Sequence, residues 1–184
     1  MNWLHRHYCS SSHWRRTLDG LVPWALDGVS LGDHVLELGP GPGQVTPMLL
    51  SRRARVTAID RDPTMADAFR LRRIGGAAIV RGDATTLPFA IATFSAVVAF
   101  TMLHHLPTAA LQDRLFHEAF RALRPGGVFV GMDPRTSVGL RLVHLGDNCV
   151  PLAPETIRPR LAAAGFHDIA IEARSGYVKF SGTA

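Results

Sequence analysis

Three carboxylates and a glycine-rich run are the residues of this sequence best suited to chemistry. Glu37 lies two residues before the run GPGPG at residues 39–43, and Asp60 and Asp83 follow further along the chain. Glycines at alternate positions let the chain turn sharply and allow a ligand to approach bare backbone amides, where a Cβ would collide. A carboxylate at the end of an apolar segment is costly to bury without a partner. These residues therefore form a candidate ligand site.

The glycine spacing separates two kinds of nucleoside-binding site. A dinucleotide site needs G-x-G-x-x-G, so that a helix N-terminus meets a pyrophosphate. Residues 39–43 have the spacing G-x-G-x-G, and Glu37 would repel a pyrophosphate but would suit an α-amino group and a sulfonium cation. Asp60 is placed to accept hydrogen bonds from both ribose hydroxyls. Asp83 can accept one from an adenine amino group, and the backbone N–H of Ala84 can donate to the ring. Together the three acids fit an adenosine joined to a positively charged amino acid.

The segments around these residues predict one doubly wound α/β domain. Each acid falls at the carboxyl end of an expected strand, which is where such sheets bind their ligands. An almost entirely apolar segment, residues 94–100, is typical of a strand buried on both faces. We expect strands at 34–38, 55–60, 77–81, 94–100, 128–132, 168–173 and 176–181, the last two forming a tight hairpin. We expect helices at 13–26 (with a kink or break at Pro23), over about nine residues from 44, and at 62–73, 109–123 and 154–164.

Length and composition are those of one folded domain with a sizeable core. The chain has 184 residues, of which 47% are hydrophobic and 19% charged, so it is not a disordered protein. Its first residues do not resemble a signal peptide, and no apolar segment is long enough to cross a bilayer. Cys9 and Cys149 lie far apart in sequence, which favours free thiols in a reducing compartment. We therefore expect a cytoplasmic protein without a membrane span, and peripheral membrane contact stays open.

The positive charge of the chain does not by itself indicate a nucleic-acid partner. The formal net charge is +5, and Lys179 is the sole lysine among 20 basic residues. No run of five basic residues occurs. The densest groups, at 52–55 and 70–73, fall at the ends of expected helices, where cations are favoured. We interpret the charge as arginine spread over solvated faces, so a nucleic-acid partner is not expected.

Four segments in this order and spacing carry a resemblance to a known family. They are residues 35–43 (VLELGPGPG), 58–60 (AID), 82–89 (GDATTLPF) and 123–127 (LRPGG). Over about residues 34–182 the chain resembles the class I S-adenosylmethionine-dependent methyltransferases. The resemblance implies a Rossmann-like seven-stranded sheet of order 3-2-1-4-5-7-6 with the last strand antiparallel, and S-adenosylmethionine as methyl donor. It divides the chain into an N-terminal helical arm or cap, 1–33, and an S-adenosylmethionine-binding domain, 34–184. The cofactor contacts it implies are Glu37, Gly39, Gly41, Gly43, Asp60, Arg61, Asp83, Ala84, Phe100 and Thr101.

The segment Leu103-His104-His105-Leu106 looks most like that of the ubiquinone/menaquinone-type methyltransferases, which act on small molecules. Methyl transfer from a sulfonium is an in-line displacement, so the site must align the reactants and exclude water. An oxygen acceptor gains from a general base, and His104 or His105 is the candidate for that role. The commoner use of such a histidine is to bond a loop or to pack on the cofactor. We expect no metal site, because adjacent side chains such as these two should point apart.

Two other functions stay open: an RNA or protein methyltransferase, and a non-catalytic S-adenosylmethionine-binding module. A methyltransferase acting on base amino groups would show a [D/N]-P-P-[Y/F] turn, whereas this chain has FTML at residues 100–103. A non-catalytic module would be favoured by loss of one of the three acids, yet all are present. A lid over the substrate could come from the aromatic arm (Trp3, Tyr8 and Trp14), from residues 134–153, or from a second subunit. We accordingly expect a monomer or a homodimer.

Overall fold

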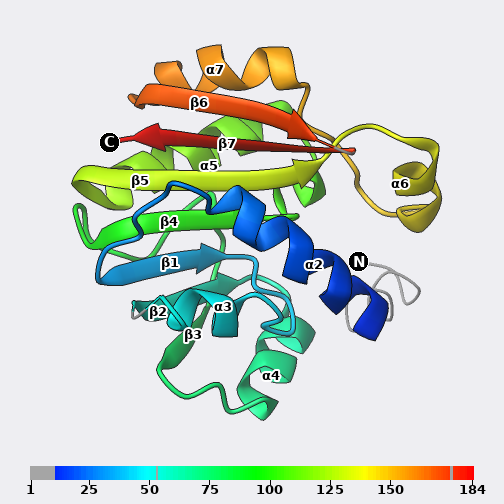
Figure 1. The fold of residues 1–184 in the computed structure, drawn as a ribbon, viewed down its shortest axis with the longest axis horizontal. Coiled ribbons are helices and arrows are strands. Elements are labelled where there is room, and N and C mark those ends of the chain that lie inside the picture. Colours follow the sequence, from blue (N-terminus) through cyan, green and yellow to red (C-terminus); the bar gives the residue numbers. More distant parts are fainter. Residues whose placement is uncertain (1–10, 53, 175) are drawn as a thin grey trace.

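The protein folds into one seven-stranded mixed sheet with helices on both faces (Figure 1). The computed structural model describes residues 11–52, 54–174 and 176–184. The strands are β1 (His34–Leu38), β2 (Arg55–Asp60), β3 (Ala77–Arg81), β4 (Phe94–Phe100), β5 (Leu123–Pro134), β6 (His167–Arg174) and β7 (Tyr177–Thr183). Their order is β3-β2-β1-β4-β5-β7-β6, and β7 runs antiparallel to both of its neighbours. The fold class and the strand order predicted from the sequence are confirmed.

Most of the described helices begin at a residue whose side chain caps the first turn. They are α2 (Ser12–Ala25), α3 (Thr46–Leu50), α4 (Pro63–Leu71), α5 (Ala109–Ala122), α6 (Val138–Val143) and α7 (Pro154–Ala163), with a 3₁₀ turn, η1, at Leu103–His105. The side chains of Ser11, Asp62 and Thr108 cap α2, α4 and α5 by accepting hydrogen bonds from backbone amides in the first turn, whereas α3 and α7 have no such cap. Among the described residues, no helix is long and apolar enough to cross a membrane.

Four elements differ from the sequence-based expectation. The helix after the glycine run, α3, has five residues instead of about nine and carries Pro47 in its first turn. Helix α2 continues through Pro23 and ends two residues later, so any distortion caused by the proline affects only the last turn of the helix. Strand β5 begins directly after α5, because Gly126 N–H donates to the carbonyl of Ala184 and draws the expected loop into the sheet. Neither η1 nor α6 was predicted.

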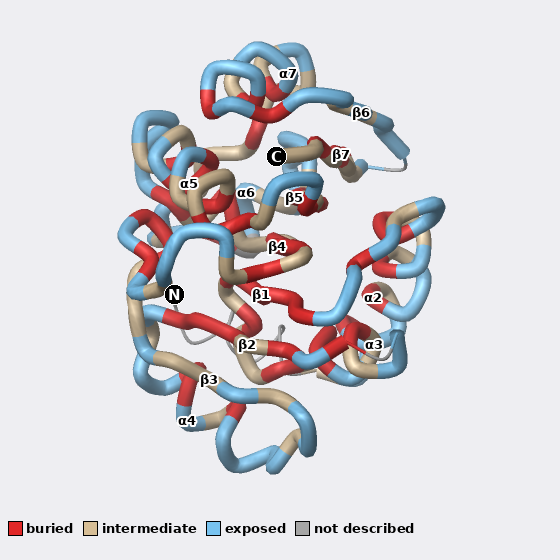
Figure 2. Tube along the Cα trace, turned by 90° about the vertical axis from the view of Figure 1, so that its left-hand side faces the viewer, coloured by how far each residue is buried: buried red, intermediate tan, exposed pale blue. Residues whose placement is uncertain are grey.

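The sheet separates two hydrophobic clusters, one on each face. Figure 1 shows α2 lying across one face and α5 behind the other. Strand β4 serves both clusters: Ala96, Val98 and Phe100 pack with α2 and α3, while Phe94, Val97 and Ala99 pack with α5 and α7. In Figure 2 the central strands β1 and β4 are accordingly buried along most of their length. The apolar run at 94–100 is therefore buried on both faces, as predicted.

One close contact between β5 and β7 depends on a glycine. Gly131 is paired with Phe180 in the sheet register. A Cβ at position 131 would lie 2.0 Å from Cζ of Phe180, so the aromatic ring covers the bare backbone of β5. Gly20, in contrast, lies on the exposed side of α2 with no neighbouring atom within 4 Å of its would-be Cβ.

The same substitution at these two glycines should therefore have opposite effects on stability. We expect Gly131→Ala to lower the free energy of unfolding by about 1–3 kcal/mol, because the buried ring must move. Gly20→Ala should raise it by about 0.5–1 kcal/mol, because alanine favours a helix interior. Urea denaturation of both variants beside the wild type measures the difference. Equal shifts in the same direction would contradict this account of the β5–β7 contact.

Candidate functional site

A cavity of about 590 Å³ opens at the carboxyl ends of β1, β2 and β4. Strand order reverses between β1 and β4, which is where doubly wound sheets bind their ligands. The cavity walls come from the glycine run, α2, the turn η1 and residues 146–148. Seven predicted cofactor contacts line it: Glu37, Gly39, Gly41, Asp60, Arg61, Phe100 and Thr101. The other three, Gly43, Asp83 and Ala84, do not line this cavity.

The three glycines of the run have different surroundings, although all have positive φ. A Cβ on Gly39 would meet the Met102 side chain at 3.0 Å, and one on Gly43 would meet the Phe69 ring at 2.7 Å. Gly41 lines the cavity, and its would-be Cβ has no protein atom within 4 Å. Gly41 thus leaves its backbone open to a ligand, whereas Gly43 allows the run to pack against α4.

Asp60 holds the glycine run at the end of β2. Its Oδ2 accepts a hydrogen bond of 3.2 Å from Gly41 N–H, and its Oδ1 accepts one of 2.9 Å from Asp62 N–H. Burial raises the pKa of this carboxyl, and the two backbone amides counteract the rise. Since each carboxylate oxygen can accept a second hydrogen bond, Asp60 keeps acceptor capacity toward the cavity that it lines.

Glu37 is a buried carboxyl at the end of β1, with 3% of its surface exposed. The Thr46 hydroxyl donates a hydrogen bond of 2.7 Å to Glu37 Oε2. Burial raises the Glu37 pKa to about 7, with a smaller contribution from the charge of Asp60. A cation in the cavity would favour the ionised form of Glu37 and lower this pKa again. The site is therefore built to receive positive charge.

The residue that follows β4 has a strained backbone. Thr101 has a φ of +53°, in the left-handed region that β-branched residues rarely adopt. Its N–H donates to the carbonyl of Met132 on β5, which fixes this conformation. Phe100, Thr101 and Met102 all line the cavity, with the would-be Cβ of Gly39 against Met102. Backbone strain of this kind is concentrated at binding and catalytic sites.

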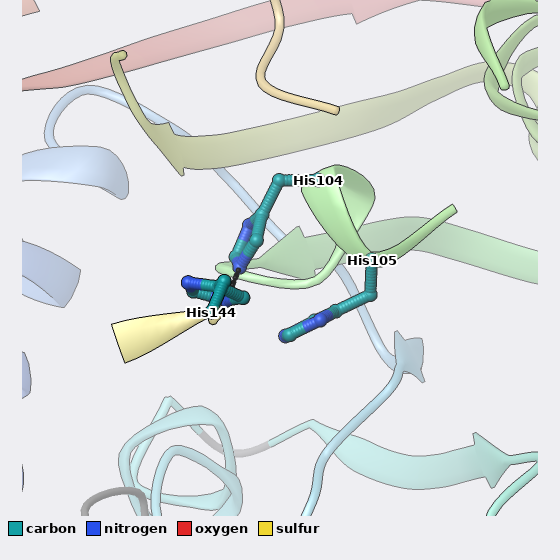
Figure 3. Close-up of side chains that lie close together, drawn as sticks. All are labelled: His104, His105 and His144. Atoms are coloured by element: carbon teal, nitrogen blue, oxygen red, sulfur yellow. Dashed lines mark hydrogen bonds between the residues drawn. The ribbon is translucent and has the colours of Figure 1, made fainter. Parts of the chain in front are cut away.

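The two candidate bases occupy different places. His105 lines the cavity, whereas His104 is buried, with 3% of its surface exposed, and does not line it. Nδ1 of His104 hydrogen-bonds Oδ1 of Asp133, and Nε2 lies 3.1 Å from Nε2 of His144 (Figure 3). The ring centroids of His104 and His105 are 4.1 Å apart. The expectation that these side chains point apart was wrong, because residues 103–105 form a 3₁₀ turn in place of an extended segment.

Two further residues belong to this histidine group. Asp133, at the end of β5, is fully buried and accepts hydrogen bonds from the backbone N–H groups of Leu103 and His104. His144 caps the C-terminal end of α6, and burial lowers its pKa. The sequence predicts a strand over residues 128–132, directly before Asp133, but His144 was missed. That histidine lies in an irregular apolar segment, where no spacing or motif marks it.

Asp83 is held away from the cavity by its own loop. The backbone N–H and the hydroxyl of Thr85 both donate to Asp83 Oδ1, each over 2.8 Å. Partial burial acts to raise the pKa of Asp83, but these hydrogen bonds outweigh it, so the pKa is lowered. Asp83 is thus held as an anion close to the end of β3, and its contact with a cofactor stays a prediction.

Helix α2 forms one wall of the cavity through Trp14 and Leu18. Its other end is attached to the last hairpin: Trp24 Nε1 donates to Glu172 Oε1 over 2.8 Å, and Lys179 Nζ donates to the Trp24 carbonyl over 2.9 Å. Of the three aromatic residues expected as one possible lid, Trp14 lines the cavity, and the lid itself stays a prediction. Trp3 and Tyr8 lie outside the described residues.

Comparison with known proteins places this chain in a family. A sequence model of the methyltransferase domain family matches residues 36–131. An uncharacterised methyltransferase from Synechocystis sp. is 33% identical over 105 residues, covering 57% of this chain and 49% of that protein. The 2-methyl-6-phytyl-1,4-hydroquinone methyltransferase 2 of Oryza sativa is 31% identical over 133 residues, covering 70% and 37%. Ribosomal RNA small subunit methyltransferase A of Mycobacterium avium is 58% identical over 40 residues, covering 22% and 13%.

The chain spans about half the length of the first of these relatives and less of the other two. Among solved structures, the PH0226 protein of Pyrococcus horikoshii superposes with a TM-score of 0.80 at 17% identity, covering 95% of this chain and 93% of that one. This likeness concerns the fold. The family match spans the segments that supply the glycine run, Asp60 and the end of β4. The chain therefore belongs to the methyltransferase domain family, within the class I S-adenosylmethionine-dependent methyltransferases.

Proposed function

We propose that the protein transfers the methyl group of S-adenosylmethionine to a small molecule, at an oxygen, nitrogen or carbon nucleophile. The observation that carries this proposal is a single cavity that joins the acidic edge of the sheet to an apolar wall. Trp14, Leu18, Met102 and Leu106 line the same space as Glu37 and Asp60. Its volume of about 590 Å³ lies within the usual range of small-molecule pockets.

In this proposal the cofactor lies along the ends of β1, β2 and β4. Glu37 receives the cationic amino acid portion, Asp60 the ribose hydroxyls, and the open backbone at Gly41 allows close approach. The adenine ring lies toward β3, where Asp83 and Ala84 are the predicted contacts. The sulfonium then lies beside residues 100–102, and the acceptor occupies the space between that segment, Trp14 and residues 146–148. These walls would align the reactants and exclude water.

His105 is the candidate base for an acceptor that must lose a proton. It lines the cavity beside Leu106, while His104 is buried behind it. We therefore assign contact with the acceptor to His105 and support of the turn to His104. Asp133 holds that turn by accepting hydrogen bonds from the amides of Leu103 and His104.

The share of the chain that is matched supports a small acceptor. The hydroquinone methyltransferase match extends over 70% of this chain, whereas the ribosomal RNA methyltransferase matches cover 22–44% of it. RNA or protein methylation and non-catalytic cofactor binding remain the rival functions. The division at residue 33, the cytoplasmic location, and a monomeric or homodimeric state stay predictions.

Methyl transfer from S-adenosylmethionine with a radiolabelled methyl group tests the acceptor class. The purified protein is incubated with substituted phenols and hydroquinones, with ribosomal subunits, or with a protein extract. We expect label in an organic-extractable small molecule. Label recovered in RNA or protein would assign the rival function, and binding of S-adenosylmethionine without transfer to any pool would indicate a non-catalytic module.

Asp60 and Asp62 offer a matched pair for testing the ribose contact. We expect Asp60→Asn to weaken binding of S-adenosylhomocysteine about 10- to 100-fold, since a charged hydrogen bond contributes about 1.5–3 kcal/mol. Asp62→Asn should have a much smaller effect, because Asp62 caps α4 through the Thr64 amide and asparagine caps as well. Calorimetric titration measures both affinities. Equal losses would show that Asp60 is not the ribose contact.

Glu37→Gln should separate stability from cofactor binding. In the free protein the Glu37 pKa, about 7, lies above its unfolded value of 4.5, so the folded state binds this proton more tightly. The stability that this proton provides is present below pH 4.5 and is lost as the pH rises through 7. Between pH 4.5 and 8 the wild type should therefore lose on the order of 3 kcal/mol of unfolding free energy through this group. The glutamine variant cannot ionise at this position and should not show that loss.

The same variant should bind S-adenosylmethionine more weakly than wild type at pH 8, because the negative charge is gone. Wild-type affinity should fall as the pH drops below 7, while the variant's should change less. Urea denaturation and calorimetry across this range measure the two effects. Glu155→Gln, at the exposed start of α7, is the control and should show neither. A Glu37→Gln variant that binds the cofactor like wild type would contradict this role of Glu37.

A further inference from the structure

The arrangement of His104, His105 and His144 carries an inference beyond methyl transfer itself. Each ring offers one nitrogen, and the three nitrogens lie within 4.8 Å of one another. Figure 3 shows the rings gathered from η1 and from the end of α6 around a common space. We propose that these three imidazoles bind a divalent transition-metal ion of the Zn²⁺ type at the acceptor end of the cavity.

Hydrogen bonding fixes which nitrogens face one another. Nδ1 of His144 lies 2.8 Å from the carbonyl oxygen of Leu140, which can only accept, so this Nδ1 carries a hydrogen. Nδ1 of His104 is hydrogen-bonded to Asp133, a buried carboxyl that already accepts hydrogen bonds from two backbone N–H groups. We therefore assign a hydrogen to this Nδ1 as well, which it donates to Asp133. Both Nε2 atoms of the neutral rings therefore present lone pairs. A further proton or a metal ion must lie between them, because two lone pairs at 3.1 Å repel.

The separation of these two nitrogens suits a metal ion. Zn–N bonds of 2.0–2.1 Å in tetrahedral geometry place two ligand nitrogens roughly 3.3 Å apart, and the Nε2 atoms are 3.1 Å apart. His105 completes the set, since its ring centroid lies 4.1 Å from that of His104 and 5.2 Å from that of His144. The ligand nitrogens of the three rings lie within 4.8 Å of one another, so His105 must move closer to bring its nitrogen to bonding distance.

The groups behind the ligands also match a metal centre. A metal-bound histidine almost always donates its other N–H to a carboxylate or a backbone carbonyl. His104 does so to Asp133, and His144 does so to Leu140. Three neutral imidazoles without a thiolate favour Zn²⁺ and its first-row neighbours over Mg²⁺ or Ca²⁺. A site with three histidines leaves a fourth position for water or substrate, and here His105 lies at the cavity wall.

The part that the ion plays in the reaction rests on the proposed function, whereas its binding does not. With the ion bound, His105 would be a ligand in place of the general base, and a hydroxyl of the acceptor at the fourth position would lose its proton to solvent more readily, as metal-bound water does. The oxygen lone pair would then form the new O–C bond with the methyl carbon. The C–S bond would break, with its electron pair going to sulfur and leaving S-adenosylhomocysteine. The rival arrangement is a buried imidazolium shared by His104 and His144, which would bind no metal.

Titration of the chelator-treated protein with Zn²⁺ alone, without cofactor or acceptor, tests the site. We expect one equivalent to bind, and His105→Ala and His144→Ala each to weaken binding at least tenfold. His117→Ala removes an exposed histidine of α5 and should leave the affinity unchanged. Circular dichroism verifies folding, and if His144→Ala does not fold, His105→Ala alone decides. Co²⁺ in place of Zn²⁺ should give visible absorption bands that both cluster variants reduce.

Absence of binding to the wild type would overturn the inference, as would His105→Ala binding Zn²⁺ as tightly as wild type, or His117→Ala weakening it equally. Because no methyl group is transferred in this titration, the result is independent of the acceptor assay. Methyl transfer to a small molecule by a protein that binds no zinc would overturn the metal site and leave the proposed function standing. One-equivalent binding that depends on His105 would support the site even where no small acceptor is methylated.

Discussion

The structure depends on two carboxyls buried at neighbouring strand ends, Glu37 and Asp60. Burial raises the pKa of both, which means that each charge is held at a cost. Their described hydrogen-bond donors, the Thr46 hydroxyl and the amides of Gly41 and Asp62, are all neutral. These donors lower the free-energy cost of burying the two carboxylates, but they do not neutralise the negative charge. These hydrogen bonds tie the glycine run and α3 to the strand ends, and both carboxyls line the cavity.

Much of the fold could be predicted because local signals coincide with element ends. Strands β1 to β4 match their predicted bounds to the residue: β1 and β3 stop directly before a glycine, β2 stops at an acid, and β4 is one unbroken, almost entirely apolar run. The errors arose where contacts between residues far apart in the sequence determine where an element begins. Strand β5 starts early because Gly126 pairs with the last residue of the chain, Ala184. The turn η1 and helix α6 lack a periodic apolar pattern, so nothing local marks them.

The site was predictable to the extent that one short motif encodes it. Glu37 lies at the end of β1, Gly39 and Gly41 follow it in the next turn, and Asp60 ends β2, so their convergence follows from the parallel order of β1 and β2. The meeting of His104 with His144 depends on the path of residues 135–150 back over the strand ends. A hydrogen bond from Val150 N–H to the His104 carbonyl helps to fix that path. Sequence spacing does not encode such a return.

The attachment of α2 bears on the order in which the site is assembled during synthesis. Trp24 is joined to Glu172 and Lys179, which lie 148 and 155 residues further along the chain. Trp14 and Leu18, on the same helix, wall the cavity. A nascent chain can form the glycine run and the acidic strand ends long before these partners leave the ribosome. The packing of α2 on β1 and β4 can form early, whereas the hydrogen bonds of Trp24 can form only after residues 172 and 179 have been synthesised.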